Sequence, residues 1–263
     1  SYGESETRAF HIVAEVAEKD GLDVAYDRAG NLVITLEGEQ SEQPFVACGS
    51  HLDSVPEGGN FDGAAGVIAG LLVLISLRRA GFVPATSLKV YALRAEESAW
   101  FGQAYLGSRA LFGALASEDL ALAHRDSGQP LEQYMVAAGA DVEAMRAGEP
   151  LLKATEVACY FELHIEQGPV MVAREIVVGV VTGIRGNHRH AHVTCTGEAA
   201  HSGAVPRWLR HDAVFAISEF IMRLDRHWQA LLEQGQDLVV TVGILGTNPA
   251  EHAMSRVPGH VEC

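Results

Sequence analysis

The stretch between residues 44 and 77 constrains the fold most, because a short apolar run, a glycine-rich turn and a long apolar segment follow one another there. Residues 44–48 are apolar and end at Gly49, a pattern typical of a strand covered on both faces of a sheet. Residues 63–77 are apolar with small side chains first, which predicts a buried, closely packed helix. A buried strand that leads into a buried helix indicates a layered α/β core.

A histidine and an aspartate lie between these two segments. His51 follows the strand, and the turn at residues 57–60 contains two glycines, so the backbone can fold tightly and bring Asp62 back toward His51. Asp53 is two residues beyond His51 and points the same way in an extended chain, so we expect it to accept a hydrogen bond from the second ring nitrogen. The stretch therefore predicts half of a metal site.

The whole chain is predicted to form two domains, at residues 1–180 and 181–263. In the first domain, we predict helices at residues 4–19, 63–80, 103–115, 131–138 and 142–147, and strands at 31–36, 45–49, 87–94 and 157–163. The last three of these helices are expected to cover the sheet. Near residue 179 the composition changes, and strand 189–196, helix 209–232 and strand 238–245 indicate a separate α+β unit.

A pair of glutamates and one further histidine also stand where predicted strands end. Glu96 and Glu97 follow strand 87–94, and His164 follows strand 157–163. Ligands of open α/β sheets gather outside the carboxyl ends of strands, so these residues are expected to share a crevice with His51 and Asp62. Imidazole and carboxylate groups suit zinc or a similar divalent metal, and one of the two glutamates is free to take a proton from water.

A rival metal site consists of three alternating histidines. His188, His190 and His192 would share one face of a strand, and such a row can bind zinc. No carboxylate lies nearby in the sequence to complete the ligand set. We therefore prefer the interpretation that these side chains form the polar face of an edge strand.

The net charge and the length of the apolar segments argue against two classes of partner, and the cysteines indicate a cellular compartment. The formal net charge is −15, which argues against nucleic acid, because that interaction depends on lysine and arginine. No apolar segment reaches the roughly 20 residues that span a membrane, so we expect no membrane partner. Four cysteines show no metal-binding spacing, and Cys48 and Cys159 lie in strands expected to be buried. A reducing cytoplasm is the expected location.

Four stretches resemble the signatures of the hydantoinase/carbamoylase family of amidases, within the M20-type group of metallohydrolases. They are residues 49–53 (GSHLD), 58–63 (GGNFDG), 96–97 (EE) and 162–169 (ELHIEQGP). The resemblance runs from about Gly30 to Gly259. It implies a layered α/β zinc-hydrolase core of the aminopeptidase type with a smaller α+β lid and dimerisation domain. The last stretch is the most specific, because peptidases of the wider group are expected to carry a carboxylate where this chain has His164.

The resemblance also implies two divalent metal ions and their ligands. Asp62 would bridge the two ions, with His51 and His164 on one and Glu97 on the other. Zinc is the expected metal, with manganese, cobalt or nickel as alternatives. Glu96 would act as the general base.

Two further residues receive roles from the same resemblance. Gln167 would contact the substrate, and His201 of the small domain would stabilise the oxyanion. The implied partner is a second copy of the chain, which would form a homodimer through the lid.

We therefore expect an amidohydrolase that cleaves the carbamoyl C–N bond of N-carbamoyl-L-amino acids or related ureido acids. The alternatives are an allantoate amidohydrolase, an M20-type peptidase or aminoacylase, and an inactive fragment that only binds or dimerises. The resemblance further implies that the chain is truncated within the lid, before a histidine ligand and a substrate-binding arginine. The 263-residue chain is accordingly expected to be nearly inactive.

Overall fold

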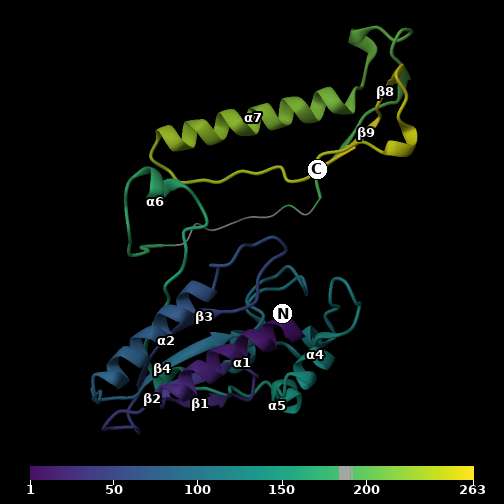
Figure 1. The fold of residues 1–263 in the computed structure, drawn as a ribbon. Coiled ribbons are helices and arrows are strands. Elements are labelled where there is room, and N and C mark those ends of the chain that lie inside the picture. Colours follow the sequence, from purple (N-terminus) through teal and green to yellow (C-terminus); the bar gives the residue numbers. More distant parts are fainter. Residues whose placement is uncertain (184–189, 191) are drawn as a thin grey trace. The chain divides into compact units, whose positions relative to one another are not determined.

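The computed structural model describes residues 1–183, 190 and 192–263 (Figure 1). The chain divides into two compact units, Ser1–Val177 and Val178–Cys263. The first unit contains a five-stranded sheet with helices on both faces, and the second contains one long helix with short strands. Each unit is described below by itself.

The sheet of the first unit has the strand order β1-β2-β4-β3-β5. Its strands are β1 (Asp23–Tyr26), β2 (Leu32–Leu36), β3 (Phe45–His51), β4 (Leu88–Leu93) and β5 (Val157–Phe161). β2 pairs antiparallel with both β1 and β4, whereas β3 runs parallel to both β4 and β5. The carboxyl ends of β3, β4 and β5 therefore meet at one edge, and the predicted α/β class is confirmed.

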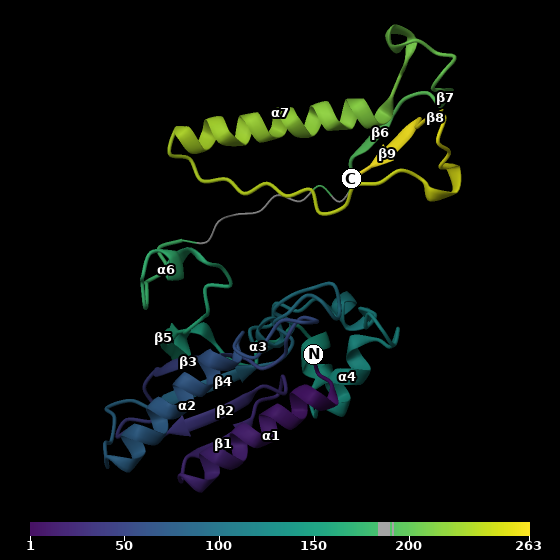
Figure 2. The same ribbon diagram turned by 45° about the horizontal axis from the view of Figure 1, so that its top comes forward.

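Two long helices, α1 (Glu4–Lys19) and α2 (Ala64–Arg79), cover one face of this sheet (Figure 2). The alternation of side chains along β2 explains the contact, because Leu32 and Ile34 point into this layer and Val33 points to the opposite one. Phe10 of α1 and Val67 of α2 are fully buried against them. The observed bounds of α1 are those that the sequence predicts.

Shorter helices cover the opposite face, as predicted. They are α3 (Leu106–Leu111), α4 (Leu131–Ala137) and α5 (Val142–Arg146). Their residues Leu106, Met135 and Met145 pack with Val33 and Tyr91 of the sheet in one apolar cluster. Short 3₁₀ turns at Ser117–Ala121 and Ala154–Glu156 and the helix α6 (Val170–Ala173) complete the elements of this unit.

The prediction that β5 is buried is wrong. β5 pairs with β3 on one side and has no strand on its other side in the described part of the chain. Cys159 is exposed, and Tyr160 and Phe161 are 41% and 64% exposed. An apolar strand is buried only when another layer covers it, and the sequence of the strand does not contain that information.

The second unit is built around α7 (Ala213–Glu233), which packs against β6 (Thr194–Thr196) and β9 (His260–Glu262). The Asp212 side chain accepts hydrogen bonds from the first backbone amides of α7 and so begins the helix. A second short pair, β7 (Ala200–His201) and β8 (Arg256–Val257), lies in the same unit.

Two strand predictions for this unit need correction. Residues 238–245 contain no strand, and the described part of the predicted strand 189–196 is ordered as a strand only over β6. A short run of β-branched residues forms a strand only where a neighbour pairs with it. Across both units, none of the described helices is long and apolar enough to cross a membrane.

Candidate metal centre

The predicted ligands of the first unit lie where the parallel strands end. His51 is the last residue of β3 and pairs in register with Leu93, the last residue of β4. Glu96 and Glu97 follow β4 within four residues, and His164 follows β5 within three. The parallel arrangement therefore brings together side chains that are up to 113 residues apart in the sequence.

The two histidines are oriented in the same way. The Nδ1 atom of His51 lies 2.9 Å from the carbonyl oxygen of Asp53, and Nδ1 of His164 lies 2.6 Å from the carbonyl oxygen of Ile165. A neutral imidazole donates one N–H and keeps one lone pair, so a donating Nδ1 leaves Nε2 as the acceptor atom. Both rings thus present the nitrogen that can bind a metal.

Asp62 supplies the third donor of this group. One ligand atom each from His51, Asp62 and His164 lie within 4.8 Å of one another. Nε2 of His164 is 3.6 Å from Oδ1 of Asp62, too long for a hydrogen bond but close to the roughly 3.4 Å between two ligands of a tetrahedral zinc ion with bonds of about 2.1 Å.

The Oδ1 atom of Asp62 carries the strongest indication that a cation belongs here. It is buried and has no hydrogen-bond partner among the described residues. Buried polar atoms are normally paired, and a buried carboxylate oxygen without a donor is costly. The other oxygen, Oδ2, lies 2.5 Å from the side-chain nitrogen of Gln167. The residues present therefore fit a divalent metal.

Glu96 and Glu97 form a second group with His51. Their ligand atoms also lie within 4.8 Å of one another, and Nε2 of His51 is 3.7 Å from Oε2 of Glu96. The two backbone amides of this pair donate to the carboxylate of Asp53, at 3.1 Å and 3.2 Å. The structure differs here from the expectation, because the carbonyl of Asp53, not its carboxylate, is the closest acceptor for the His51 ring.

The pKa values of His51, Glu96 and Glu97 are shifted from their usual values. Burial lowers the pKa of His51, but the hydrogen bond to Asp53 and the charges of Asp53 and Glu96 outweigh it and raise the pKa to about 9. Burial also raises the pKa of Glu96 and Glu97, and His51 opposes the shift in both. Without a metal, the group thus combines a His51 ring that holds its proton at neutral pH with two glutamates that hold protons more readily than usual.

Other predicted positions lie outside this group. His201 is in the second unit, exposed, and its Nδ1 accepts a hydrogen bond from the backbone of Gly203 at 3.1 Å. His188 lies outside the described residues, and His190 and His192 are exposed and precede β6. Within the part of the chain that the structure describes, neither belongs to a group of three metal-binding side chains.

Two supporting hydrogen bonds were not foreseen. Ser50 donates to Oε1 of Glu162 at 2.5 Å and so ties the end of β3 to the segment that carries His164. The indole nitrogen of Trp100 donates to the carbonyl of Ser54 at 2.8 Å and links the loop after β4 to the loop after β3. Nothing in the local sequence pattern identifies such contacts, because they join residues 46 or more positions apart.

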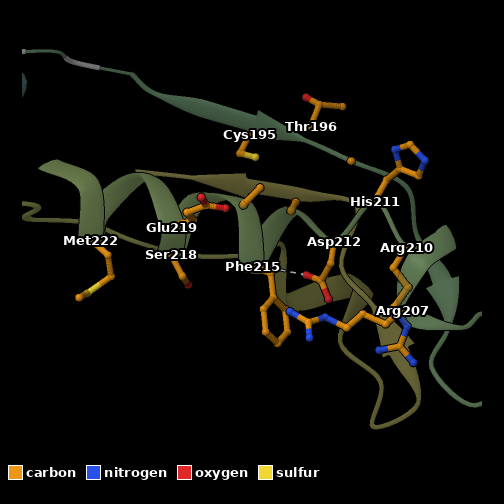
Figure 3. Close-up of a pocket in the computed structure, with 13 residues that line it drawn as sticks. Cys195, Thr196, Arg207, Arg210, His211, Asp212, Phe215, Ser218, Glu219 and Met222 are labelled. Atoms are coloured by element: carbon orange, nitrogen blue, oxygen red, sulfur yellow. Dashed lines mark hydrogen bonds between the residues drawn. The ribbon is translucent and has the colours of Figure 1, made fainter.

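The second unit has a cavity of its own at the start of α7 (Figure 3), lined among others by Arg207, Arg210, Asp212 and Glu219. Asp212 is engaged by the backbone amides of Val214 and Phe215, and Arg210 donates to the carbonyl of Val205 at 2.8 Å. These two polar groups therefore serve the local structure of the helix start. Neither of the two groups of metal-binding side chains found among the described residues lies at this cavity.

The chain is similar to several known proteins. It is 38% identical to an N-carbamoyl-L-amino acid amidohydrolase from Geobacillus stearothermophilus, over 94% of this chain and 58% of that protein. It is 32% identical to an allantoate amidohydrolase from Escherichia coli, over 91% of this chain and 56% of that protein.

A crystal structure of a hydantoinase/carbamoylase family amidase from Burkholderia ambifaria matches the whole chain and 61% of its own, with a TM-score of 0.81 and 34% identity. The resemblance found in the sequence is thus confirmed, although the chain spans only about three fifths of the length of these proteins. The profile of peptidase family M20/M25/M40 matches residues 47–262, and the chain belongs to this family.

Proposed function

We propose that the protein is a metal-dependent amidohydrolase that cleaves the carbamoyl C–N bond of N-carbamoyl-L-amino acids or related ureido acids. The observation that carries the proposal is the group of His51, Asp62 and His164, in which Oδ1 of Asp62 is buried without a hydrogen-bond partner among the described residues. The similarity to amidohydrolases of ureido compounds supports the choice of substrate class.

Two divalent ions, with zinc as the favoured metal, are part of the proposal. His51 and His164 would hold one ion, Glu97 would hold the other, and Asp62 would bridge them. When bound, such ions polarise a carbonyl group and lower the pKa of water. Imidazole and carboxylate donors also accept manganese, cobalt or nickel, so metal identity is decided by comparing the four metals in one assay.

The chain's own residues supply binding and proton transfer. Glu96 would take a proton from the attacking water, and its pKa, raised by burial, brings it closer to the working range of a general base. His201 accepts a hydrogen bond at Nδ1, so its neutral ring carries the proton at Nε2 and can donate it to an oxyanion. Gln167 would contact the substrate after it releases Asp62.

The domain roles and the oligomer belong to the same proposal. Residues 1–180 would form the catalytic domain and residues 181–263 a lid that also carries the contact of a homodimer. Three large apolar side chains on α7 support such a contact, because Phe215, Phe220 and Met222 are 69%, 46% and 56% exposed. Light scattering of the parent and of Phe220→Glu tests it, and a monomeric parent would contradict it.

A cytoplasmic location completes the proposal. All four cysteines are free thiols, and free thiols persist most readily in a reducing compartment. Fractionation of cells that express the natural gene measures this directly.

The decisive experiment compares substrates. The protein, in the full length that its gene encodes, is loaded with each metal in turn. It is then assayed for ammonia release from N-carbamoyl amino acids and allantoate, and for cleavage of N-acetyl amino acids and dipeptides. We expect ammonia from an N-carbamoyl amino acid, lost in Glu96→Gln. Preference for allantoate would change the substrate, and preference for a dipeptide or N-acetyl amino acid would assign a peptidase or aminoacylase. Metal binding without turnover of any substrate would favour the binding-only alternative.

A further inference from the structure

The segment at residues 94–97, which carries Glu96 and Glu97, is hydrogen-bonded along both of its edges. On one edge, the carbonyl groups of residues 94–96 accept from the first backbone amides around α3. The bonds are Gly107 to Arg94 at 3.0 Å, Leu106 to Ala95 at 2.9 Å and Tyr105 to Glu96 at 2.8 Å. All three carbonyls thus have a donor, although consecutive carbonyls of a regular β-strand would face opposite edges.

On the other edge, the acceptors are side chains. Four consecutive backbone amides each donate to a buried acceptor: Arg94 to Asn31 Oδ1 at 2.9 Å, Ala95 to Glu6 Oε1 at 3.0 Å, Glu96 to Asp53 Oδ1 at 3.1 Å and Glu97 to Asp53 Oδ2 at 3.2 Å. Asn31, Glu6 and Asp53 are 0%, 5% and 4% exposed. They come from three separate parts of the chain.

Ala95 is the point in the segment that most needs such support. Its φ angle of 49° is left-handed, which costs a residue with a side chain roughly 1–2 kcal/mol. Conformations of this kind persist only where the surroundings enforce them. The acceptor for the Ala95 amide is Glu6 of α1, whose other oxygen receives the guanidinium of Arg94 at 3.0 Å. Glu6 touches none of the proposed metal ligands' side chains in the described contacts.

We propose that Glu6 is a positioning residue, which holds the backbone at Ala95 so that Glu96 and Glu97 face the metal centre. The inference rests on the proposed function, because it assigns Glu6 a role toward the metal that Glu97 would bind. A purely structural role predicts that loss of Glu6 lowers stability and leaves metal affinity unchanged. A positioning role predicts that metal affinity falls in proportion to the loosening of the 94–97 backbone.

The test separates the acceptor oxygen of Glu6 from its charge. Glu6→Gln keeps an oxygen for the Ala95 amide, and Glu6→Ala does not. Because either change removes the carboxylate that pairs with the buried Arg94, both are repeated in an Arg94→Met background, which removes that positive charge but keeps every backbone amide. Glu4→Ala, an exposed change in the same turn of α1, is the matched control.

Two readouts are taken on the 263-residue chain. Hydrogen exchange of the 95–97 amides in the metal-free chain should be about tenfold faster with Ala at position 6 than with Gln, as expected for one lost neutral hydrogen bond. In zinc titration the second equivalent should bind about 10- to 100-fold more weakly with Ala, the range seen when groups that orient ligands are lost. Gln and the Glu4→Ala control should stay near their parents in both.

Equal exchange for Ala and Gln would overturn the inference, and so would faster exchange with unchanged zinc binding. If the parent binds no zinc, the proposed function fails. The exchange measurement then still decides whether Glu6 holds this backbone.

Discussion

Nε2 of His164 and Oδ1 of Asp62 lie 3.6 Å apart, and Oδ1 has no hydrogen-bond partner among the described residues. The two residues come from different loops, one after β5 and the other before α2. Their separation matches two ligands on one tetrahedral ion better than an ion pair. The predictions below follow from this relationship and from the packing around it.

Removal of either member of this pair should empty the first metal position. Asp62→Ala and His164→Ala are each expected to weaken zinc binding by about 100-fold or more, beyond the usual loss for groups that merely orient a ligand. Competition with a chromophoric chelator measures the affinity. His192→Ala, an exposed residue of the rival row, serves as control and should bind zinc like the parent. Zinc loss in His192→Ala with retention in His164→Ala would place the metal in the rival row.

Zinc affinity should rise with pH through the neutral range. The pKa of His51 is raised to about 9 in the metal-free chain, so the ring is protonated at pH 7 and must lose its proton to bind a metal. One displaced proton predicts about a tenfold gain in affinity per pH unit up to pH 9 and none above it.

Calorimetry in buffers of different ionisation enthalpy counts the released proton. Asp53→Asn removes one of the charges that raise the pKa of His51, so the zinc affinity of this variant should stop rising at a lower pH. A pH-independent affinity in the parent would contradict the assignment of His51 as a ligand.

Gly63 should tolerate no side chain, because a Cβ there would lie 2.5 Å from the carbonyl oxygen of His51 and 2.6 Å from its ring. Gly63→Ala is expected to cost about 1–3 kcal/mol in unfolding free energy, through overpacking, and to weaken zinc binding by displacing His51. Gly59 is the matched control, since it also has a positive φ but has open space around its Cβ position.

Urea unfolding and zinc titration of both variants make the comparison. Gly59→Ala should lose about 1 kcal/mol from the left-handed backbone alone and keep its zinc affinity. Equal zinc affinity in the two variants would show that His51 does not bind the metal.

The exposed edge of the first unit should promote association. β5 presents Tyr160 and Phe161 without a covering strand in the described part of the chain, and apolar edges of this kind pair with other chains. Phe161→Lys is expected to reduce the concentration-dependent light scattering of the 263-residue chain. Val172→Lys, an exposed change away from the strand, is the control. Unchanged scattering in Phe161→Lys would locate the association elsewhere.

The sequence by itself determined most elements of the first unit and the positions of the proposed ligands. Apolar periodicity located α1 and α2, and His51, Glu96 and His164 were recognisable because each follows an apolar run that ends abruptly. Such signals are local, since they depend on the spacing of side chains along a helix or strand. The order of those elements was sufficient to predict that their ends converge.

Only the tertiary structure decided which groups those side chains meet. Glu6 belongs to the predicted helix 4–19 and no pattern in the sequence marks it as buried, yet it is buried and accepts a hydrogen bond from the amide of Ala95, 89 positions away. β5 reads as a buried strand, yet it lies at an exposed edge. Periodicity specifies which face of an element is apolar, but the partner that covers a face, or the amide that meets a buried carboxylate, is set by long-range packing.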